Sequence, residues 1–131
     1  MASVAASMKQ VTRIDREALD FILEASRSSH PREFVGVLRA SGDTITEVLL
    51  LPGTISSDRS AVLRLHMLPL DPSACGTVHS HPTPNAAPSQ QDAALFSKFG
   101  RVHIIAAHPY GERSWKAYNH RWEEVHLEVV G

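Results

Sequence analysis

Two histidines and an aspartate stand at a spacing that can hold a metal ion. His79 and His81 are one residue apart, and Asp92 stands eleven positions after His81. In a strand, residues i and i+2 point to the same face, so the two imidazoles can converge on one small cation. Zinc binds histidine nitrogen and carboxylate oxygen, and two His with one Asp leave a fourth tetrahedral position open. That open position is typical of a catalytic zinc site and not of a structural one.

Two further residues could carry out the chemistry beside such a metal. Glu33 stands at the start of an apolar stretch, where a carboxylate could take a proton from water and pass it to a leaving amine. The hydroxyl of Ser89 could donate to a developing oxyanion. Both residues also have an ordinary interpretation. Ser89-x-x-Asp92 fits a helix N-terminal cap that needs no metal, and Glu33 alone fits a solvated surface charge.

The other potential ligands are interpreted as structural. Cys75 stands four residues before His79, and a thiolate ligand there would close the position that a catalytic site keeps open. We therefore expect Cys75 to pack in the interior, and a single cysteine excludes an internal disulfide. The remaining histidines are interpreted as surface or hydrogen-bonded core residues: His30, His66, His103, His108, His120 and His126.

The elements that must position these residues follow from the hydrophobic pattern. Asp15 is a candidate N-cap for a helix that runs to about Ser28 and ends before Pro31. A second helix is expected from Ser89 to about Phe99 and stops at a glycine. Strands are expected at 34–39, 45–51, 62–65, 75–81, 102–107 and 125–129, with turns at 41–43 and 71–73. Strands mixed with two helices predict an α/β (α+β mixed) fold, a sheet with helices packed against it.

Length and composition set the remaining bounds. The chain of 131 residues fits one domain, and its formal net charge is -1 with no basic cluster. Nucleic-acid and anionic-membrane partners therefore have no electrostatic support. No apolar run approaches the roughly 18 residues of a membrane span. We expect residues 1–13 to be a flexible leader that is not a signal peptide, residues 14–131 to form the domain, and the protein to be cytoplasmic.

The pattern of a Glu, then His-x-His-Pro, then Ser-x-x-Asp resembles the signature of the JAMM (MPN+) zinc metalloprotease family. The matching residues are Glu33, His79, His81, Pro82, Ser89 and Asp92. The resemblance covers about residues 14–130 and extends to small single-domain archaeal members, which are deubiquitinase-like or desampylase-like.

This resemblance implies a curved sheet flanked by helices, related in architecture to the cytidine deaminases. It implies one zinc ion per chain held by His79, His81 and Asp92, with Glu33 as general base and Ser89 as oxyanion donor. The implied activity is hydrolysis of the isopeptide bond between the C-terminal glycine of a ubiquitin-like modifier and a lysine amine. The partners would be that modifier and its conjugates, whose extended tail would pair with a strand within 55–68.

Several alternative functions remain open, with or without catalysis at the same site. A processing hydrolase could release a sulfur carrier or modifier from a C-terminal extension, and a scaffold of this fold could bind partners without catalysis. Iron, cobalt or manganese would also suit two His and one Asp. Other His-x-His enzymes are excluded: a nucleoside deaminase needs Pro-Cys-x-x-Cys, a barrel amidohydrolase needs about 200 residues, and a metallo-β-lactamase needs Asp-His after His81.

Overall fold

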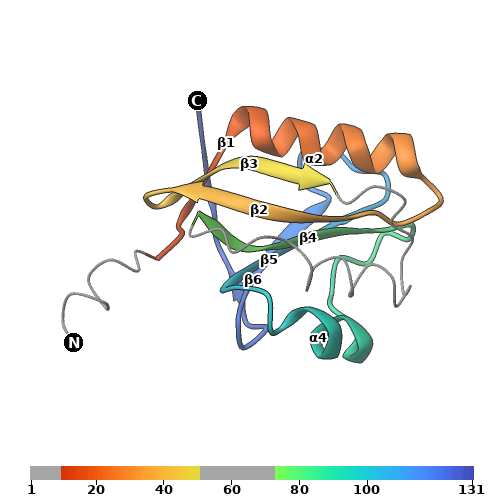
Figure 1. The fold of residues 1–131 in the computed structure, drawn as a ribbon. Helices are drawn as coiled ribbons and strands as arrows, with labels where there is room; N and C mark the ends of the chain where they lie inside the picture. Colours follow the sequence, from red (N-terminus) through yellow and green to blue (C-terminus); the bar gives the residue numbers. More distant parts are fainter. Residues whose placement is uncertain (1–9, 51–72) are drawn as a thin grey trace.

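A mixed sheet forms the centre of the protein, whose computed structural model describes residues 10–50 and 73–131. Within the described residues, the sheet has eight strands in the order β7-β6-β5-β4-β2-β3-β1-β8. Helices α2 and α4 lie on opposite sides of it (Figure 1). The predicted α/β fold, a curved sheet flanked by helices, is confirmed. The expected strand at 62–65 and the expected tail-binding segment at 55–68 lie outside the described residues.

The strand that carries the two histidines, β4, lies between β2 and β5 in the interior of the sheet. β4 is antiparallel to β2 and parallel to β5, and all six residues of β5 are buried, as their apolar run predicted. The eight strands are β1 (Arg13–Asp15), β2 (Val35–Ser41), β3 (Thr44–Leu50), β4 (Ala74–His81), β5 (Val102–Ala107), β6 (Trp115–Asn119), β7 (Glu124–Val125) and β8 (Glu128–Val130).

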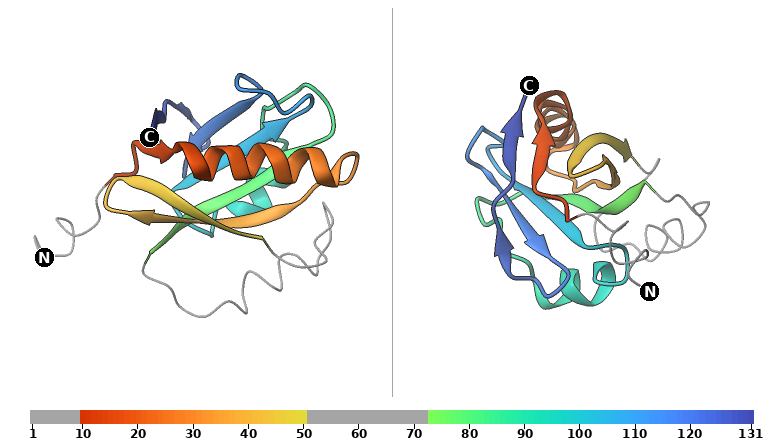
Figure 2. Two further views of the ribbon diagram at one scale, coloured as in Figure 1. Left: turned by 90° about the horizontal axis from the view of Figure 1, so that it is seen from above. Right: turned by 90° about the vertical axis from the view of Figure 1, so that its left-hand side faces the viewer.

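The C-terminal segment closes the curl of the sheet, and here the prediction of a single strand at 125–129 is wrong. β7 pairs with β6 at one end of the sheet, and β8 pairs with β1 at the other. Only His126 and Leu127 separate these two strands, and the Leu127 side chain is buried in the core. One short stretch of chain thus joins both ends of the sheet, which curls round as Figure 2 shows.

Two short strands were not predicted at all. β1 begins at Arg13, one residue inside the expected leader, and lies between β3 and β8. Three residues are too few to show a period-2 pattern in the sequence, so β1 is recognised only from its pairing with the neighbouring strands. β6 mixes polar and aromatic residues and is held by its antiparallel pairing with β5.

Helix α2 (Arg16–Ser29) covers one face of the sheet. Its N-cap is Asp15, and Ala18, Leu19 and Ile22 are among its buried residues, as the helical spacing predicted. These side chains belong to the main core cluster, which also contains residues of β2, β4 and β5. In the described residues, no helix is long and apolar enough to cross a membrane.

Helix α4 (Gln90–Phe96) covers the other face and is shorter than predicted. It ends at Phe96 instead of Phe99, with Ser97 as its C-cap, and the chain then turns. Gly100 follows with φ +110 and lies directly against the backbone of Cys75 and Gly76, where a side chain would clash. Phe96 itself packs on Val35 and Val37 of β2.

Candidate metal centre

The two histidines of the predicted motif lie at the carboxyl end of β4, in the middle of the sheet. They alternate with Ser80, so both imidazoles project to the face that α4 covers. The His79 ring is buried and stacks on Phe96 of α4, with ring centroids 4.8 Å apart and planes inclined by 20°. His79 also pairs with Val35 and Ile105 on the neighbouring strands, which fixes its backbone from both sides.

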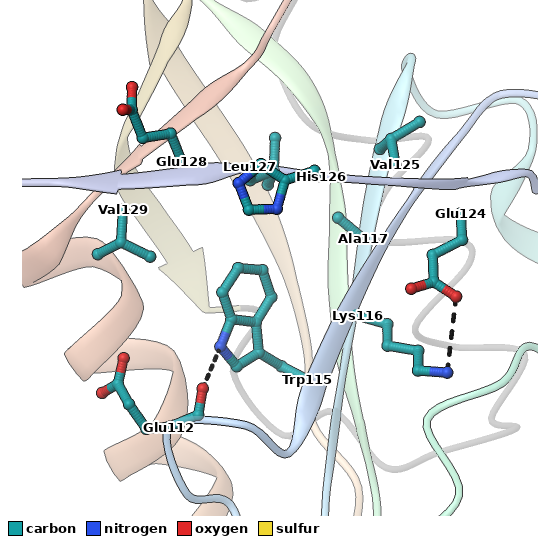
Figure 3. A pocket seen from close by; sticks show the side chains of 10 residues that line it. All are labelled: Glu112, Trp115, Lys116, Ala117, Glu124, Val125, His126, Leu127, Glu128 and Val129. Atoms are coloured by element: carbon teal, nitrogen blue, oxygen red, sulfur yellow. Dashed lines mark hydrogen bonds and ion pairs between the residues drawn. The ribbon is translucent and has the colours of Figure 1, made fainter.

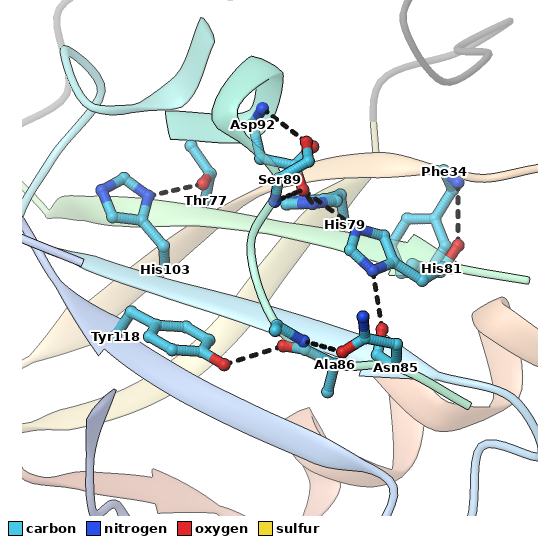
Figure 4. A network of polar contacts seen from close by, with 12 residues as sticks. Phe34, Thr77, His79, His81, Asn85, Ala86, Ser89, Asp92, His103 and Tyr118 are labelled. Carbon is cyan, nitrogen blue, oxygen red and sulfur yellow. Dashed lines mark hydrogen bonds and ion pairs between the residues drawn. The ribbon is translucent and has the colours of Figure 1, made fainter. Parts of the chain in front are cut away.

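Asp92 reaches the histidines from the first turn of α4. Its Oδ2 lies 3.0 Å from Nε2 of His81 and 3.3 Å from Nε2 of His79. The same oxygen accepts the backbone N–H of Ser89 at 2.9 Å. One ligand atom from each of His79, His81 and Asp92 lies within 4.8 Å of the others. Figure 4 shows the three side chains converging.

The polar atoms of this cluster fit a divalent metal. Both ring nitrogens of His79 are buried. Among the described residues, Nδ1 has no hydrogen-bond partner, and Nε2 has only the 3.3 Å ion-pair contact with Asp92. A buried polar group without a partner is costly unless a ligand satisfies it. Nδ1 of His81 lies 2.9 Å from the carbonyl oxygen of Asn85, which can only accept, so Nδ1 carries a proton. That leaves Nε2 to face the centre of the cluster, the usual arrangement for a metal-binding imidazole.

Electrostatics also favour a cation here. Burial alone would raise the pKa of Asp92, but the imidazoles of His79 and His81 outweigh it and lower that pKa well below its usual value. Burial alone would lower the pKa of His81, yet Asp92, the Asn85 carbonyl and the charge of Glu33 together raise it. A divalent ion would replace the Nε2 proton that these negative groups stabilise.

The loop after β4 is held in place by its own contacts. The Tyr118 hydroxyl donates to the Ala86 carbonyl at 2.8 Å, and the Ala87 N–H bonds to the Asn85 side chain at 2.9 Å. These bonds fix the Asn85 carbonyl that orients His81. Sequence reasoning missed this contact because a backbone carbonyl leaves no signal in residue type.

Glu33 lies beside this cluster, in the connection between α2 and β2. The strand starts at Val35 and not at Phe34, so Glu33 precedes it by two residues. Phe34 donates its N–H to the Ser80 hydroxyl at 3.0 Å, and Ser80 donates its N–H to the Phe34 carbonyl at 3.2 Å. Glu33 is thereby placed next to the His81 end of β4, where it is partly buried and its charge acts on His81.

Ser89 is the N-cap of α4 and forms a complete capping box with Asp92. Its hydroxyl oxygen accepts the Asp92 N–H at 3.0 Å. The capping interpretation is confirmed, and it does not compete with metal binding, because the capping carboxylate also faces both imidazoles. The hydroxyl of Ser89 is exposed and keeps its own proton free to donate.

The remaining candidate ligands stand apart from the cluster. Cys75 packs against the core, its Sγ lies 3.5 Å from the Leu38 carbonyl, and burial raises its pKa to about 12. His103 is fully buried, with Nδ1 2.7 Å from the Thr77 hydroxyl and its ring stacked on Trp122. The prediction of a hydrogen-bonded core histidine is therefore confirmed at Nδ1, whereas Nε2 makes no hydrogen bond that meets the usual geometry among the described residues. His66 lies outside the described residues.

A surface pocket lies elsewhere, between β6 and the C-terminal segment. Its lining includes Trp115, Val125, Leu127 and Val129, with Lys116 paired to Glu124 at its edge (Figure 3). None of the clustered histidines or Asp92 lines this pocket.

Comparison with known proteins identifies the family. The family described as prokaryotic homologs of the JAB domain matches residues 15–118. This chain belongs to that family. A probable metalloprotease of Haloferax volcanii is 40% identical to it over 132 residues, covering 93% of this chain and 81% of the relative.

Solved JAMM/MPN structures share the fold. A JAB1/MPN domain protein from Archaeoglobus fulgidus is 43% identical, with a TM-score of 0.76, and the match covers 92% of this chain and all of that one. A second structure, described as a JAMM metalloprotease-like zinc site in the proteasome and signalosome, is 42% identical with a TM-score of 0.73 over 93% of this chain and all of that one. The JAMM resemblance of the sequence motif is therefore confirmed at the level of family and fold.

Proposed function

We propose that this JAMM protein is a zinc-dependent isopeptidase that cleaves the bond between the C-terminal glycine of a ubiquitin-like modifier and a lysine amine. The observation that carries the proposal is the position of Asp92 Oδ2, within 3.3 Å of the Nε2 atoms of both His79 and His81. His79, His81 and Asp92 would hold one zinc ion. Zinc bound there would act as a Lewis acid on the attacking water and on the substrate carbonyl.

The protein's own residues would supply the proton transfers. Glu33 is the general base that takes the proton of the water and passes it to the departing amine. Ser89 donates its exposed hydroxyl to the oxyanion, while its oxygen remains the cap of α4. Partly buried Cys75 takes no part, because its raised pKa keeps the thiol protonated and the scheme needs no covalent intermediate.

The family relationship supports the proposed substrate class. The structure described as a JAMM zinc site in the proteasome and signalosome shares 42% of its residues with this chain, and the signature residues Glu33, His79, His81, Ser89 and Asp92 are all present. A flexible modifier tail could reach the metal by adding a strand to a sheet edge. The natural partners would then be the modifier and its conjugates.

Metal content is the first test of this function. The protein purified without added metal should contain about one zinc per chain, as expected for a site of two His and one Asp. His81→Ala should lose that zinc and the hydrolase activity together. A wild-type protein that binds no zinc, even when zinc is supplied, would contradict the proposal and leave a binding scaffold.

Cleavage assays then separate the two hydrolase reactions. A lysine-linked modifier conjugate should be cleaved faster than the same modifier with a short linear C-terminal extension. The opposite order would identify a processing hydrolase, and zinc binding without cleavage of either substrate would contradict both.

A further inference from the structure

Tyr110 is held in a conformation that few non-glycine residues adopt. It follows β5 with φ +62, and its side chain is 2% exposed. Its N–H donates to the Ala107 carbonyl at 2.8 Å, and its own carbonyl accepts a bond of 2.9 Å from Arg27 of α2. A left-handed backbone at a bulky residue persists only where surrounding contacts enforce it, and such residues concentrate at functional sites.

The Tyr110 hydroxyl connects two segments of the candidate active site. It lies 2.8 Å from Nδ1 of His30 and 3.2 Å from the backbone carbonyl oxygen of His81. That carbonyl also accepts the backbone N–H of His108 at 3.1 Å. The segment after β5 therefore holds the backbone of a candidate metal ligand through two donors.

The donor and acceptor in each of the two hydrogen bonds of the Tyr110 hydroxyl follow from the chemistry of the groups. A carbonyl oxygen only accepts, and a hydroxyl has one proton, so Tyr110 donates to His81. The hydroxyl oxygen must then accept, which requires that His30 carries its proton on Nδ1. This is the less usual tautomer of a neutral histidine, and NMR can detect it.

The position of His30 links these hydrogen bonds to Glu33. His30 is the residue that ends α2, three positions before Glu33. On the other side of Glu33, Phe34 is bonded to Ser80 in both directions. The short connection that carries Glu33 is thus anchored at both ends, and one of the anchors is the same hydroxyl that holds His81.

We propose that Tyr110 is a positioning residue: its hydroxyl, bonded to His30 and to the His81 carbonyl, sets the placement of Glu33 relative to the metal ligand. This inference rests on the proposed function in so far as Glu33 is the base. A misplacement of a base by about 1 Å can cost up to 100-fold in rate, so a remote hydroxyl can matter this much.

The first experiment does not depend on hydrolase activity. Histidine NMR of the wild-type protein should show His30 as the Nδ1–H tautomer, and Tyr110→Phe should shift it toward Nε2–H. Amide exchange at Arg32, whose N–H bonds to the Ser29 carbonyl at 2.8 Å, should rise in Tyr110→Phe because the connection is released at one end. A wild-type His30 in the Nε2–H tautomer would overturn the proposal.

The second experiment asks whether the hydroxyl acts through Glu33. Tyr110→Phe should lower kcat by about 10-fold or more and leave KM and zinc content within about twofold. In a Glu33→Gln background, Tyr110→Phe should cause no further loss. An equal additional loss in that background would mean that Tyr110 has only a general structural role, which overturns the proposal.

His108→Phe provides the matched control. The His108 ring stacks on His30 at 4.5 Å and contacts the edge of Tyr110, but its side chain has no hydrogen bond among the described residues. Phenylalanine keeps the stacking, so kcat and Arg32 exchange should stay at wild-type values. A loss in His108→Phe equal to that of Tyr110→Phe would assign the effect to ring packing and contradict the proposal.

A fully active Glu33→Gln, in contrast, would refute the proposed function while the tautomer of His30 still reports on the Tyr110 contact.

Discussion

Asp92 accepts the backbone N–H of Ser89 at 2.9 Å through Oδ2, the oxygen that also faces the two imidazoles. One carboxylate therefore caps the N-terminus of α4 and completes the candidate metal site. The two roles agree because the first turn of α4 lies where the Asp92 side chain reaches both its own N-cap and the histidines of β4. Stability of the helix and affinity for the metal are thus coupled through one atom.

Asp92→Asn should separate these two roles. An asparagine oxygen can still accept the Ser89 N–H, but it lacks the charge that a divalent cation needs. We expect zinc affinity to fall by more than about 100-fold, beyond the usual effect of an outer-shell change, while zinc-free stability changes little. Calorimetric zinc titration and thermal unfolding with chelator measure the two quantities. Unchanged zinc affinity would exclude Asp92 as a ligand.

Ser89 can be tested by two substitutions that differ in capping. Ser89→Ala should destabilise the protein by about 1 kcal/mol, whereas Ser89→Gly should cost only a few tenths of that, because glycine is tolerated at an N-cap. Both remove the hydroxyl donor, so both should lower kcat by about 100-fold. If Ser89→Gly keeps wild-type kcat while Ser89→Ala does not, the hydroxyl acts only as a cap.

Glu33→Gln should remove the base and spare the fold. Glutamine has nearly the same shape, and Glu33 is not part of the metal cluster, so zinc content and the thermal midpoint should stay unchanged. Loss of the proton acceptor should reduce kcat by about 100-fold or more. Single-turnover kinetics on a lysine-linked conjugate measure this loss, with Glu17→Gln on the exposed side of α2 as a control. Near wild-type turnover would disprove the base assignment.

His103 should make the folded state sensitive to acid. Burial lowers its pKa from 6.5 to about 4, so between these values the unfolded chain binds a proton that the folded protein does not. The contribution of His103 to stability is therefore fully present above pH 6.5 and is lost as the pH drops toward 4, by at most about 3 kcal/mol. His103→Phe should flatten this part of the urea-unfolding profile, and the exposed His126→Gln should not. Identical profiles for His103→Phe and wild type would contradict this assignment.

Cys75→Ala should leave turnover within about twofold of wild type, because the proposed scheme forms no covalent intermediate. The wild-type thiol should also react slowly with alkylating reagents at pH 8, since burial raises its pKa to about 12. Steady-state kinetics and the time course of alkylation in the folded protein test both statements. Rapid alkylation accompanied by loss of activity would point to a functional thiol.

The sequence alone determined the parts of this protein that depend on local pattern. The i, i+2 spacing of His79 and His81, the apolar run of β5 and the helical spacing of α2 each follow from the periodicity of one element. The same holds for the capping box of Ser89 and Asp92, because these two residues lie only three positions apart in the sequence. Local geometry is sufficient in these cases because the interacting groups are close in sequence.

Only the tertiary structure decided what depends on distant segments. It splits the C-terminal strand into β7 and β8 at opposite ends of the sheet, and it ends α4 at Phe96. It also brings Tyr110, in the segment after β5, to the carbonyl of His81 and to His30 at the end of α2. No residue type or spacing encodes these contacts, because they arise from strand pairing and from backbone carbonyls, which every residue carries.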